Sequence, residues 1–281
     1  GILARRCAPV QVNYLGFPGT MGAPYIDYIV GDATVTPPGY GRFYTEHIVR
    51  LPHSYQVNDR QRAVAPTTPS RAEAGLPEQG FVFCCFNNNY KISPAVFAVW
   101  MRLLQRIPGS VLWLLQDNAD AAAHLRASAE AAGVDPARLV LAPRVPMPEH
   151  LARQRLADLF LDTLPYNAHT TTSDALWVGL PVLTCLGESF PGRVAASLLR
   201  AAGLPELVTT SLADYEALAI TLATTPGMLA DLRTRLERGR LVCPLFDTEG
   251  FVRNMEQAYE EMARRVQAGE AHRDIDLNFD F

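Results

Sequence analysis

The chain has 281 residues, of which 48% are hydrophobic and 19% are charged, and its formal net charge at pH 7 is −4. This length and composition are typical of two compact folded lobes, and they exclude a disordered protein. No basic run stands out, and no apolar run approaches the about 18 residues that a membrane span needs, so neither nucleic acid nor a membrane is expected as a partner.

The first part of the chain, up to about residue 75, is rich in Gly, Pro and aromatic residues. Short apolar runs at Tyr25–Val30 and Ile48–Leu51 predict strands. The segment Leu15–Gly22 contains three glycines, which let a backbone approach a ligand closely. Because the chain opens without a strand or helix of its own, we interpret this part as the end of a lobe that begins upstream. Residues 63–80 are expected to form a surface linker.

From about residue 81, predicted strands and helices alternate. Phe81–Phe86 is a nearly continuous apolar run, which is typical of a strand buried on both faces. Ser93 and Pro94 are expected to cap and begin a helix that ends at Gly109. Further strands are expected at Val111–Leu115, Leu139–Ala142, Leu159–Asp162, Val182–Cys185 and Leu207–Thr209, and further helices at Ala119–Ala132, Ala175–Val178, Val194–Ala202, Ala213–Ala223 and Met228–Arg238. This alternation predicts an α/β fold with a parallel, doubly wound sheet.

The last predicted helix covers about residues 248–267. It is expected to carry one apolar stripe, made of Phe251, Met255, Tyr259, Met262 and Val266. The tail after Gly269 is polar, and we expect it to be loose.

The five cysteines predict reduced thiols. They are Cys7, Cys84, Cys85, Cys185 and Cys243, an odd number without a CxxC pair. This pattern, with no visible signal peptide, favours a cytoplasmic protein. Cys84 and Cys85 lie inside the apolar run at 81–86, so we expect them to be structural.

Ligands of an open α/β sheet bind beyond the carboxyl ends of its strands, and three polar clusters follow predicted strands. The first is Asn87–Lys91, directly after the strand at 81–86. Lys91 is the single lysine among 25 basic residues, and it precedes a predicted helix N-terminus. It is therefore a candidate to bind phosphate as a compact point charge, although a polar loop with an incidental lysine has the same pattern.

The second cluster, residues 148–153, contains His150 and Arg153, which share one face of a helix because they are three residues apart. The pair could hold a diphosphate or a ribose, or it could belong to an ordinary amphipathic turn. The third cluster runs from Asp162 to Trp177 and includes the hydroxyl-rich segment Thr170–Ser173. Free N–H groups and hydroxyls at a helix start bind phosphate, although they can also serve only as caps.

Within the third cluster, Asp174 lies one turn into the predicted helix and could accept a hydrogen bond from a ribose hydroxyl. No cluster of His, Cys and carboxylate residues has the spacing of metal ligands, so we expect neither a metal nor a cofactor.

The chain resembles the catalytic C-terminal part of the O-GlcNAc transferase family, which includes bacterial homologues and the Spindly type. The resemblance is carried in order by QVNYLGFPGTMGAPYIDYIV, FNNNYKISP, SVLWLL, LADLFLDTLPYNAHTTTSDALWVGLPVLT, GESFPGRVAAS and VCPLFDT. It implies a GT-B type fold of two Rossmann-like lobes, the first incomplete here. The implied regions are 1–77 in the first lobe, 78–245 in the nucleotide-sugar lobe, and 246–281 as a helix returning to the first lobe with a tail.

The resemblance also implies an inverting transfer of GlcNAc from UDP-GlcNAc to a Ser or Thr hydroxyl of a protein. Lys91 matches the family lysine that neutralises the donor diphosphate, and it is the implied catalytic residue. Asn88 stands where the family commonly has a Gln that contacts the nucleotide. The other implied donor-binding residues are His150 and Arg153 on the uridine and phosphate side, His169, Thr170, Thr171 and Asp174 at the diphosphate and ribose, and Leu15, Gly16 and Pro18 beside the sugar.

The chain departs from the family in two respects. The family lysine in the loop before His150 is Met147 here, which puts the nucleobase contacts of that loop in doubt. The upstream active-site residues, including a His, and the tetratricopeptide region that selects acceptors are not in this sequence, so we expect them to be removed or supplied by another chain. Three alternatives remain: a protein O-fucosyltransferase that uses GDP-fucose, a UDP-GlcNAc epimerase, and a non-catalytic nucleotide-binding module.

Overall fold

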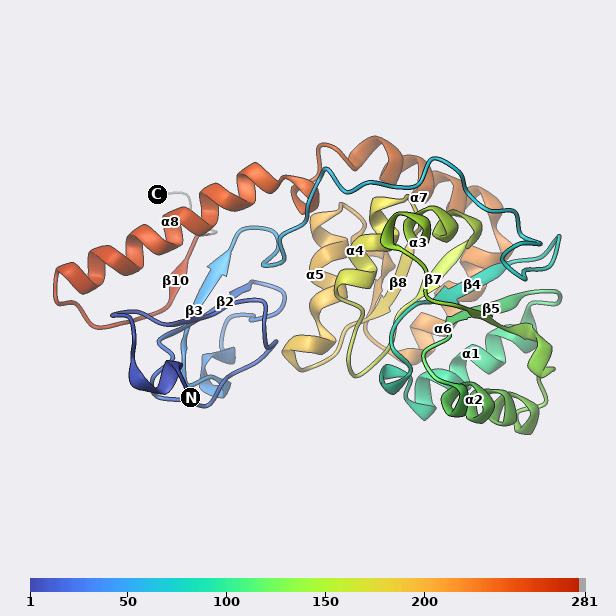
Figure 1. Ribbon diagram of the computed structural model, residues 1–281, viewed down its shortest axis with the longest axis horizontal. Helices are drawn as coiled ribbons and strands as arrows, with labels where there is room; N and C mark the ends of the chain where they lie inside the picture. The colour runs from blue at the N-terminus through green and yellow to red at the C-terminus, as the bar shows by residue number, and fades with distance from the viewer. Residues whose placement is uncertain (278–281) are drawn as a thin grey trace.

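The computed structural model describes residues 1–277, which form two lobes, each built on a parallel sheet (Figure 1). The sheet of the first lobe has the order β1-β2-β3-β10, and the sheet of the second has the order β6-β5-β4-β7-β8-β9. The strands are β1 Val12–Asn13, β2 Tyr28–Asp32, β3 His47–Leu51, β4 Val82–Cys85, β5 Val111–Leu115, β6 Leu139–Ala142, β7 Leu159–Leu161, β8 Val182–Cys185, β9 Val208–Thr209 and β10 Ile275–Asp276. The predicted α/β class with parallel sheets is confirmed.

The helices of the second lobe alternate with its strands. Helix α1 begins at Pro94, and the Ser93 hydroxyl accepts a hydrogen bond from the backbone N–H of Val96. Gly109 follows its end at a φ of +71°, which favours glycine. The helices are α1 Pro94–Arg106, α2 Ala119–Ala131, α3 Met147–Arg153, α4 Thr170–Trp177, α5 Val194–Ala201, α6 Leu212–Thr224, α7 Pro226–Gly239 and α8 Thr248–Gln267.

The strand order of the second sheet fixes where a ligand can bind. From β4, the chain builds outward through β5 and β6, and it then returns to pair β7 with the other side of β4. This reversal is a topological switch point, where the chain leaves two neighbouring strands in opposite directions and a crevice forms between the two loops. The loops that follow β4 and β7 therefore lie side by side at the carboxyl edge of the sheet.

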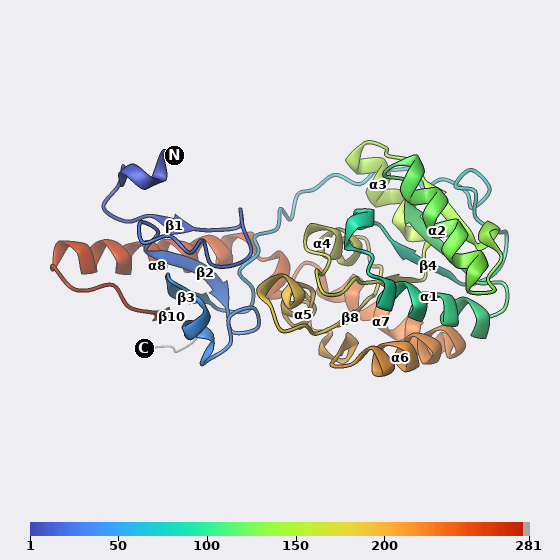
Figure 2. The same ribbon diagram turned by 90° about the horizontal axis from the view of Figure 1, so that it is seen from below.

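Helix α8 covers one face of the first sheet, as both views show (Figures 1 and 2). The apolar cluster between them contains Tyr28, Val30, Val49 and Leu51 from the strands and Met255, Ala258 and Met262 from the helix. The predicted stripe was wrong at Tyr259 and Val266, which are exposed. Residues 255, 258 and 262 follow the helical repeat, whereas 259 and 266 are turned toward one side of that stripe.

The expectation of a loose tail after Gly269 was also wrong for residues 275–276. These two residues pair with β3 in parallel, and the Asp274 carboxylate accepts a hydrogen bond from the backbone N–H of Ile48. The open edge of β3 supplies the main-chain partners, which polar sequence does not reveal. The last residues, 278–281, lie outside the described part.

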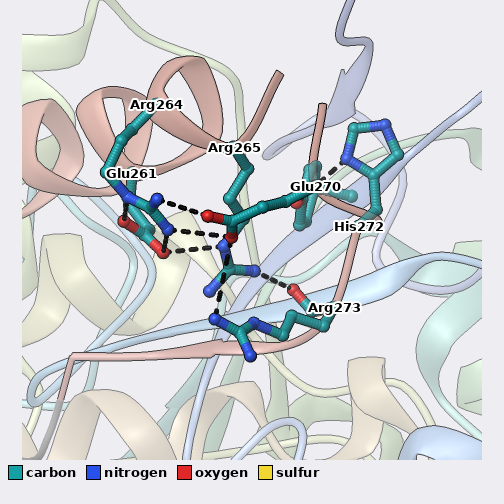
Figure 3. A network of polar contacts seen from close by, with 7 residues as sticks. Glu261, Arg264, Arg265, Glu270, His272 and Arg273 are labelled. Carbon is teal, nitrogen blue, oxygen red and sulfur yellow. Dashed lines mark hydrogen bonds and ion pairs between the residues drawn. The ribbon is translucent and has the colours of Figure 1, made fainter. Parts of the chain in front are cut away.

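Polar contacts hold the turn between α8 and this strand (Figure 3). Glu261 accepts hydrogen bonds from Arg264 and Arg265, and the two guanidinium groups lower its pKa to about 2. Arg264 also pairs with Glu270, and Arg265 donates to the backbone carbonyl of Arg273. Farther along, the His272 ring contacts the Tyr28 hydroxyl at 3.1 Å. The network joins the end of α8 to the tail and to the first sheet.

The two lobes are joined through α5. The Ser197 hydroxyl donates to the buried carboxylate of Asp32 at 2.6 Å. On the same helix edge, Arg193 Nε donates to the carbonyl oxygen of Thr34 at 2.6 Å. These contacts bring the loops of the first lobe against the carboxyl edge of the second sheet.

The adjacent thiols of Cys84 and Cys85 are both buried in β4, and burial raises their pKa values. We therefore expect iodoacetamide to leave both unmodified in the native protein while it modifies the exposed Cys7. Peptide mass mapping after brief alkylation measures this pattern. Modification of Cys84 or Cys85 that abolishes UDP binding without unfolding the protein would contradict a purely structural role.

Candidate active site

A buried carboxylate organises the loop that follows β7. Oδ1 of Asp162 accepts hydrogen bonds from the backbone N–H groups of Thr163 and Ala168, at 2.7 and 2.6 Å, and Oδ2 accepts one from the Thr184 hydroxyl at 2.6 Å. One oxygen atom thus holds both ends of the loop at residues 163–168. The sequence analysis placed Asp162 at the end of a strand and the start of the third polar cluster, but gave it no role of its own.

Lys91 lies in a 3-10 turn, Asn89–Lys91, directly after β4. Its Nζ donates to the carbonyl oxygen of Asn167 at 2.9 Å and lies 4.2 Å from the centroid of the Tyr166 ring. Burial lowers the pKa of Lys91, and the Asp162 charge opposes this effect. The single lysine is therefore fixed by the loop after the neighbouring strand, at the switch point of the sheet.

Some polar groups at the start of α4 line a cavity between the lobes, which is described below, and others are buried in the interior. His169 donates from Nε2 to the carbonyl oxygen of Pro191, and its ring stacks on Tyr166. Burial lowers the pKa of His169 to about 4, so the ring is neutral at pH 7 and its Nδ1 is an acceptor. Thr171 donates to Asn87 Oδ1 at 2.5 Å, whereas Thr170 is exposed.

The hydroxyl groups of this segment do not cap the helix. The structure shows no side-chain cap on α4. Thr172 instead donates to the carbonyl oxygen of Ala168, and Ser173 accepts a hydrogen bond from Gln56 of the first lobe. These hydroxyls therefore do not act as helix caps. Of the residues Thr170–Ser173, only Thr170 lines the cavity described next.

A cavity of about 230 Å³ lies between the lobes. Asn13 shapes its first-lobe wall by donating to the carbonyl oxygens of Phe17 and Gly19, at 3.1 and 2.9 Å. The cavity is lined by Asn13, Leu15, Gly16, Phe17, Pro18, Ile29, Val30, Tyr55, Gln56, Lys91, Tyr166, His169, Thr170 and Phe190. Six of the candidate residues thus meet in one place, and Lys91 is the only Lys or Arg in this lining.

His150 and Arg153 form a second group, next to β4 but outside that lining. Arg153 donates to His150 Nδ1 and to the carbonyl oxygen of Pro143, and its guanidinium lies over Phe86 and Trp113. Burial and the nearby arginines lower the pKa of His150 to about 4. The ring is therefore neutral, with Nδ1 as acceptor and Nε2 as the protonated nitrogen.

Arg153 itself lines a different cavity, of about 390 Å³, together with Trp113 and residues of the linker. Asn88 lines neither cavity and accepts a long hydrogen bond, 3.4 Å, from Arg144. The structure therefore places Arg153 away from the Lys91 cavity. Met147, at the start of α3, is exposed and offers no charge there.

Asp174 is buried in α4 and is paired with Arg62, which directly precedes the linker. Burial raises the pKa of Asp174, and Arg62 opposes this effect. The carboxylate that was a candidate for the ribose is therefore engaged by a guanidinium from the segment between the lobes. Sequence reasoning missed this pair because Arg62 lies outside any helix or strand, in a segment without periodicity.

Several other lining residues were also missed. Asn13, Tyr55, Gln56, Tyr166 and Phe190 come from both lobes. Tyr166 had a signal, since it lies within the third polar cluster. Phe190 follows β8 but is apolar, so it gave no polar signal. Asn13, Tyr55 and Gln56 belong to the first lobe, and they reach the cavity only because the lobes pack together.

The sequence of this chain matches one family description. Residues 1–68 and 60–255 match glycosyl transferase family 41. The chain belongs to this family. The order of the quoted motifs and the parallel two-lobe fold agree with that membership.

Relatives of this family 41 chain carry related names. A protein of Arabidopsis thaliana, named "Probable UDP-N-acetylglucosamine--peptide N-acetylglucosaminyltransferase SEC", is 43% identical over 267 residues, which is 93% of this chain and 27% of the relative. A Petunia hybrida protein, named as the corresponding probable SPINDLY enzyme, is 36% identical over 275 residues, 96% of this chain and 29% of the relative. This chain therefore spans less than a third of these two proteins.

A solved structure has the same fold. An O-GlcNAc transferase mutant of Thermobaculum terrenum is 37% identical, with a TM-score of 0.84 over 93% of this chain and 50% of that chain. This likeness supports the GT-B type arrangement of the two lobes in the family 41 chain. Among residues 1–277, no helix is both long and apolar enough to cross a membrane.

Proposed function

We propose that this chain forms the donor-binding part of an enzyme that transfers GlcNAc from UDP-GlcNAc to a Ser or Thr hydroxyl of a polypeptide, with inversion at the sugar. The observation that carries the proposal is the position of Lys91, an ammonium group fixed in the cavity between the lobes. Family membership and the names of the relatives support the donor and the acceptor class.

The proposed chemistry depends on the charge of the departing UDP. As the bond from the diphosphate to the sugar breaks, negative charge grows on the phosphate oxygen, and a preorganised cation beside it lowers the barrier. Lys91 supplies that charge, and the hydroxyl of Thr170 can donate a hydrogen bond in the same cavity, whereas the neutral His169, whose Nδ1 is an acceptor, can hold only a donor group such as a substrate hydroxyl. We propose that Lys91 and Thr170 stabilise the leaving diphosphate without a metal.

The donor-binding proposal is tested by calorimetry with nucleotides. We expect UDP to bind at least about tenfold more tightly than GDP, because a site built for the hydrogen-bonding groups of one base rejects another. A crystal structure of the complex should place UDP at residues 87–91, 148–153 and 169–174. Tighter binding of GDP would instead favour a fucosyltransferase, and UDP density elsewhere would contradict the proposed site.

The transfer itself is tested by mass spectrometry of Ser- and Thr-containing peptides incubated with UDP-GlcNAc and the protein as it is encoded. A gain of one N-acetylhexosamine per modified peptide is the expected result. Epimerised UDP-sugar formed without any acceptor would favour the epimerase, and UDP binding without turnover would favour a binding module. We also propose a cytoplasmic location, which the five unpaired cysteines support.

A further inference from the structure

The loop after β7 is closed by a single carboxylate. Asp162 is buried, and its Oδ1 accepts from the N–H groups at both ends of the 163–168 segment. Within the segment, the Thr163 hydroxyl donates to the carbonyl oxygen of Tyr166, and the Asn167 side chain donates to that of Thr163. The loop is therefore a compact unit whose two ends are held together by Asp162, and Asn87 and Ser93 donate to it from outside.

The same loop carries the groups that hold the candidate site. The carbonyl oxygen of Asn167 accepts from Lys91 Nζ, and the ring of Tyr166 lies both under that Nζ and against His169. A continuous set of contacts thus runs from the carboxylate of Asp162 through the loop to Lys91 and His169. Asp162 itself does not line the cavity, so it would act only through these neighbours.

The charge of Asp162 faces Lys91. Three other ionisable groups lie near Asp162: the thiols of Cys85 and Cys185 and the phenol of Tyr215. Burial raises the pKa of each, so all three are neutral at pH 7. Burial raises the pKa of Asp162 to about 7, against the effect of its hydrogen bonds and of Lys91. Above about pH 7, the carboxylate and the ammonium are therefore the charged pair in this part of the interior.

We propose that Asp162 is the positioning residue of the donor site, because its carboxylate folds the 163–168 loop that fixes the Lys91 ammonium and its charge balances that ammonium. This role in catalysis rests on the proposed function, whereas the placement of Lys91 does not. Two substitutions separate the shape from the charge. In Asp162→Asn, the amide oxygen can still accept both N–H groups and the amide nitrogen can donate to Thr184, whereas Asp162→Ala removes every contact.

The first test needs no substrate. Because Lys91 is the single lysine, protein labelled with [13Cε]lysine gives one lysine NMR signal, which reports its pKa and surroundings. We expect Asp162→Asn to lower the pKa of Lys91 by about 1, since an opposite charge nearby favours the ammonium. The wild-type signal should also shift once near pH 7, as Asp162 titrates. Asp162→Ala should move the signal toward that of a mobile, solvent-exposed lysine.

The second test uses function. We expect Asp162→Ala to weaken UDP binding at least about tenfold and Asp162→Asn to weaken it less than about threefold, because the asparagine keeps the loop. In the encoded protein, Asp162→Asn should change kcat less than about threefold, because it keeps the loop and Lys91 remains an ammonium, whereas Asp162→Ala should lower kcat about tenfold.

Asp32 provides the matched control. It is an equally buried carboxylate that accepts from backbone N–H groups and from the Ser197 hydroxyl, but it touches nothing in the 163–168 loop. Asp32→Asn should leave the Lys91 signal unchanged. An unchanged Lys91 signal in both Asp162 variants would overturn the proposal even if UDP binds. If the Asp162 variants show the expected Lys91 shifts but the wild-type protein does not bind UDP, only the proposed function is overturned.

Discussion

Replacement of Lys91 by alanine is expected to lower kcat about 100-fold or more for transfer from UDP-GlcNAc, as the loss of one preorganised charge-stabilising donor does. Lys91 is the only Lys or Arg that lines the cavity between the lobes, and His169 is neutral there because its pKa is about 4. No second cation in that lining can replace the lost charge. Steady-state kinetics of the encoded protein measures the effect.

The affinity for UDP should fall less than kcat in Lys91→Ala, because the contact of Lys91 tightens as the diphosphate departs and the remaining polar groups still bind the ground state. Lys91→Arg should restore little activity, since a planar guanidinium does not fit the place where Asn167 and Tyr166 hold a compact ammonium. Arg102→Ala, which removes an exposed cation on α1, serves as the control. Wild-type kcat in Lys91→Ala would show that the lysine has no catalytic role.

Replacement of Asp174 by alanine is expected to lower the free energy of unfolding by about 3–5 kcal/mol, because it leaves the Arg62 charge without its partner. Two nitrogen atoms of Arg62, Nε and Nη2, are already buried without a hydrogen bond. Denaturant unfolding followed by circular dichroism measures this loss. An effect below about 1 kcal/mol would mean that Arg62 readily reaches water once Asp174 is gone.

The double variant Arg62→Met with Asp174→Leu should recover most of that stability, since apolar residues often replace a buried ion pair at little cost. The raised pKa of Asp174 agrees with this expectation, because it means that the folded protein favours the protonated carboxyl group over the carboxylate. The contribution of Asp174 to stability therefore falls as pH rises through its folded-state pKa. UDP affinity measured on the same variants separates roles. If Asp174 also binds the ribose, the stable double variant will still bind UDP weakly.

Much of the second lobe could be predicted because its pattern is strong. The run 111–115 is apolar throughout, the run 182–185 is apolar except for Thr184, and Ser93 with Pro94 marks a helix start, so local chemistry determines these elements. The two-residue strands β1 and β10 have no such pattern, since they form only by pairing with β2 and β3. For the same reason, the sequence did not predict that residues 275–276 of the tail form a strand.

The candidate site divides in the same way. Lys91 and His169 could be proposed because each follows a strand of the second sheet, where a switch point gathers side chains. Gln56 could not, since only the packing of one lobe on the other brings it to the cavity, and Phe190 could not, since an apolar side chain after a strand carries no polar signal. Asp162 was overlooked for a third reason: its carboxylate points inward, and nothing in the sequence distinguishes a loop-closing carboxylate from one in solvent.

The apolar face beneath α8 has a consequence for how the chain is made. Tyr28, Val30, Val49 and Leu51 are synthesised near the start of the sequence, but they are covered by Met255, Ala258 and Met262, more than two hundred residues later. During synthesis on the ribosome, the sheet of the second lobe can form before α8 is made, while the apolar face of the first sheet is still exposed to water. A premature stop codon after residue 246 and before residue 255 would therefore produce a protein with an intact second lobe and an exposed hydrophobic surface, a target for chaperones and proteases.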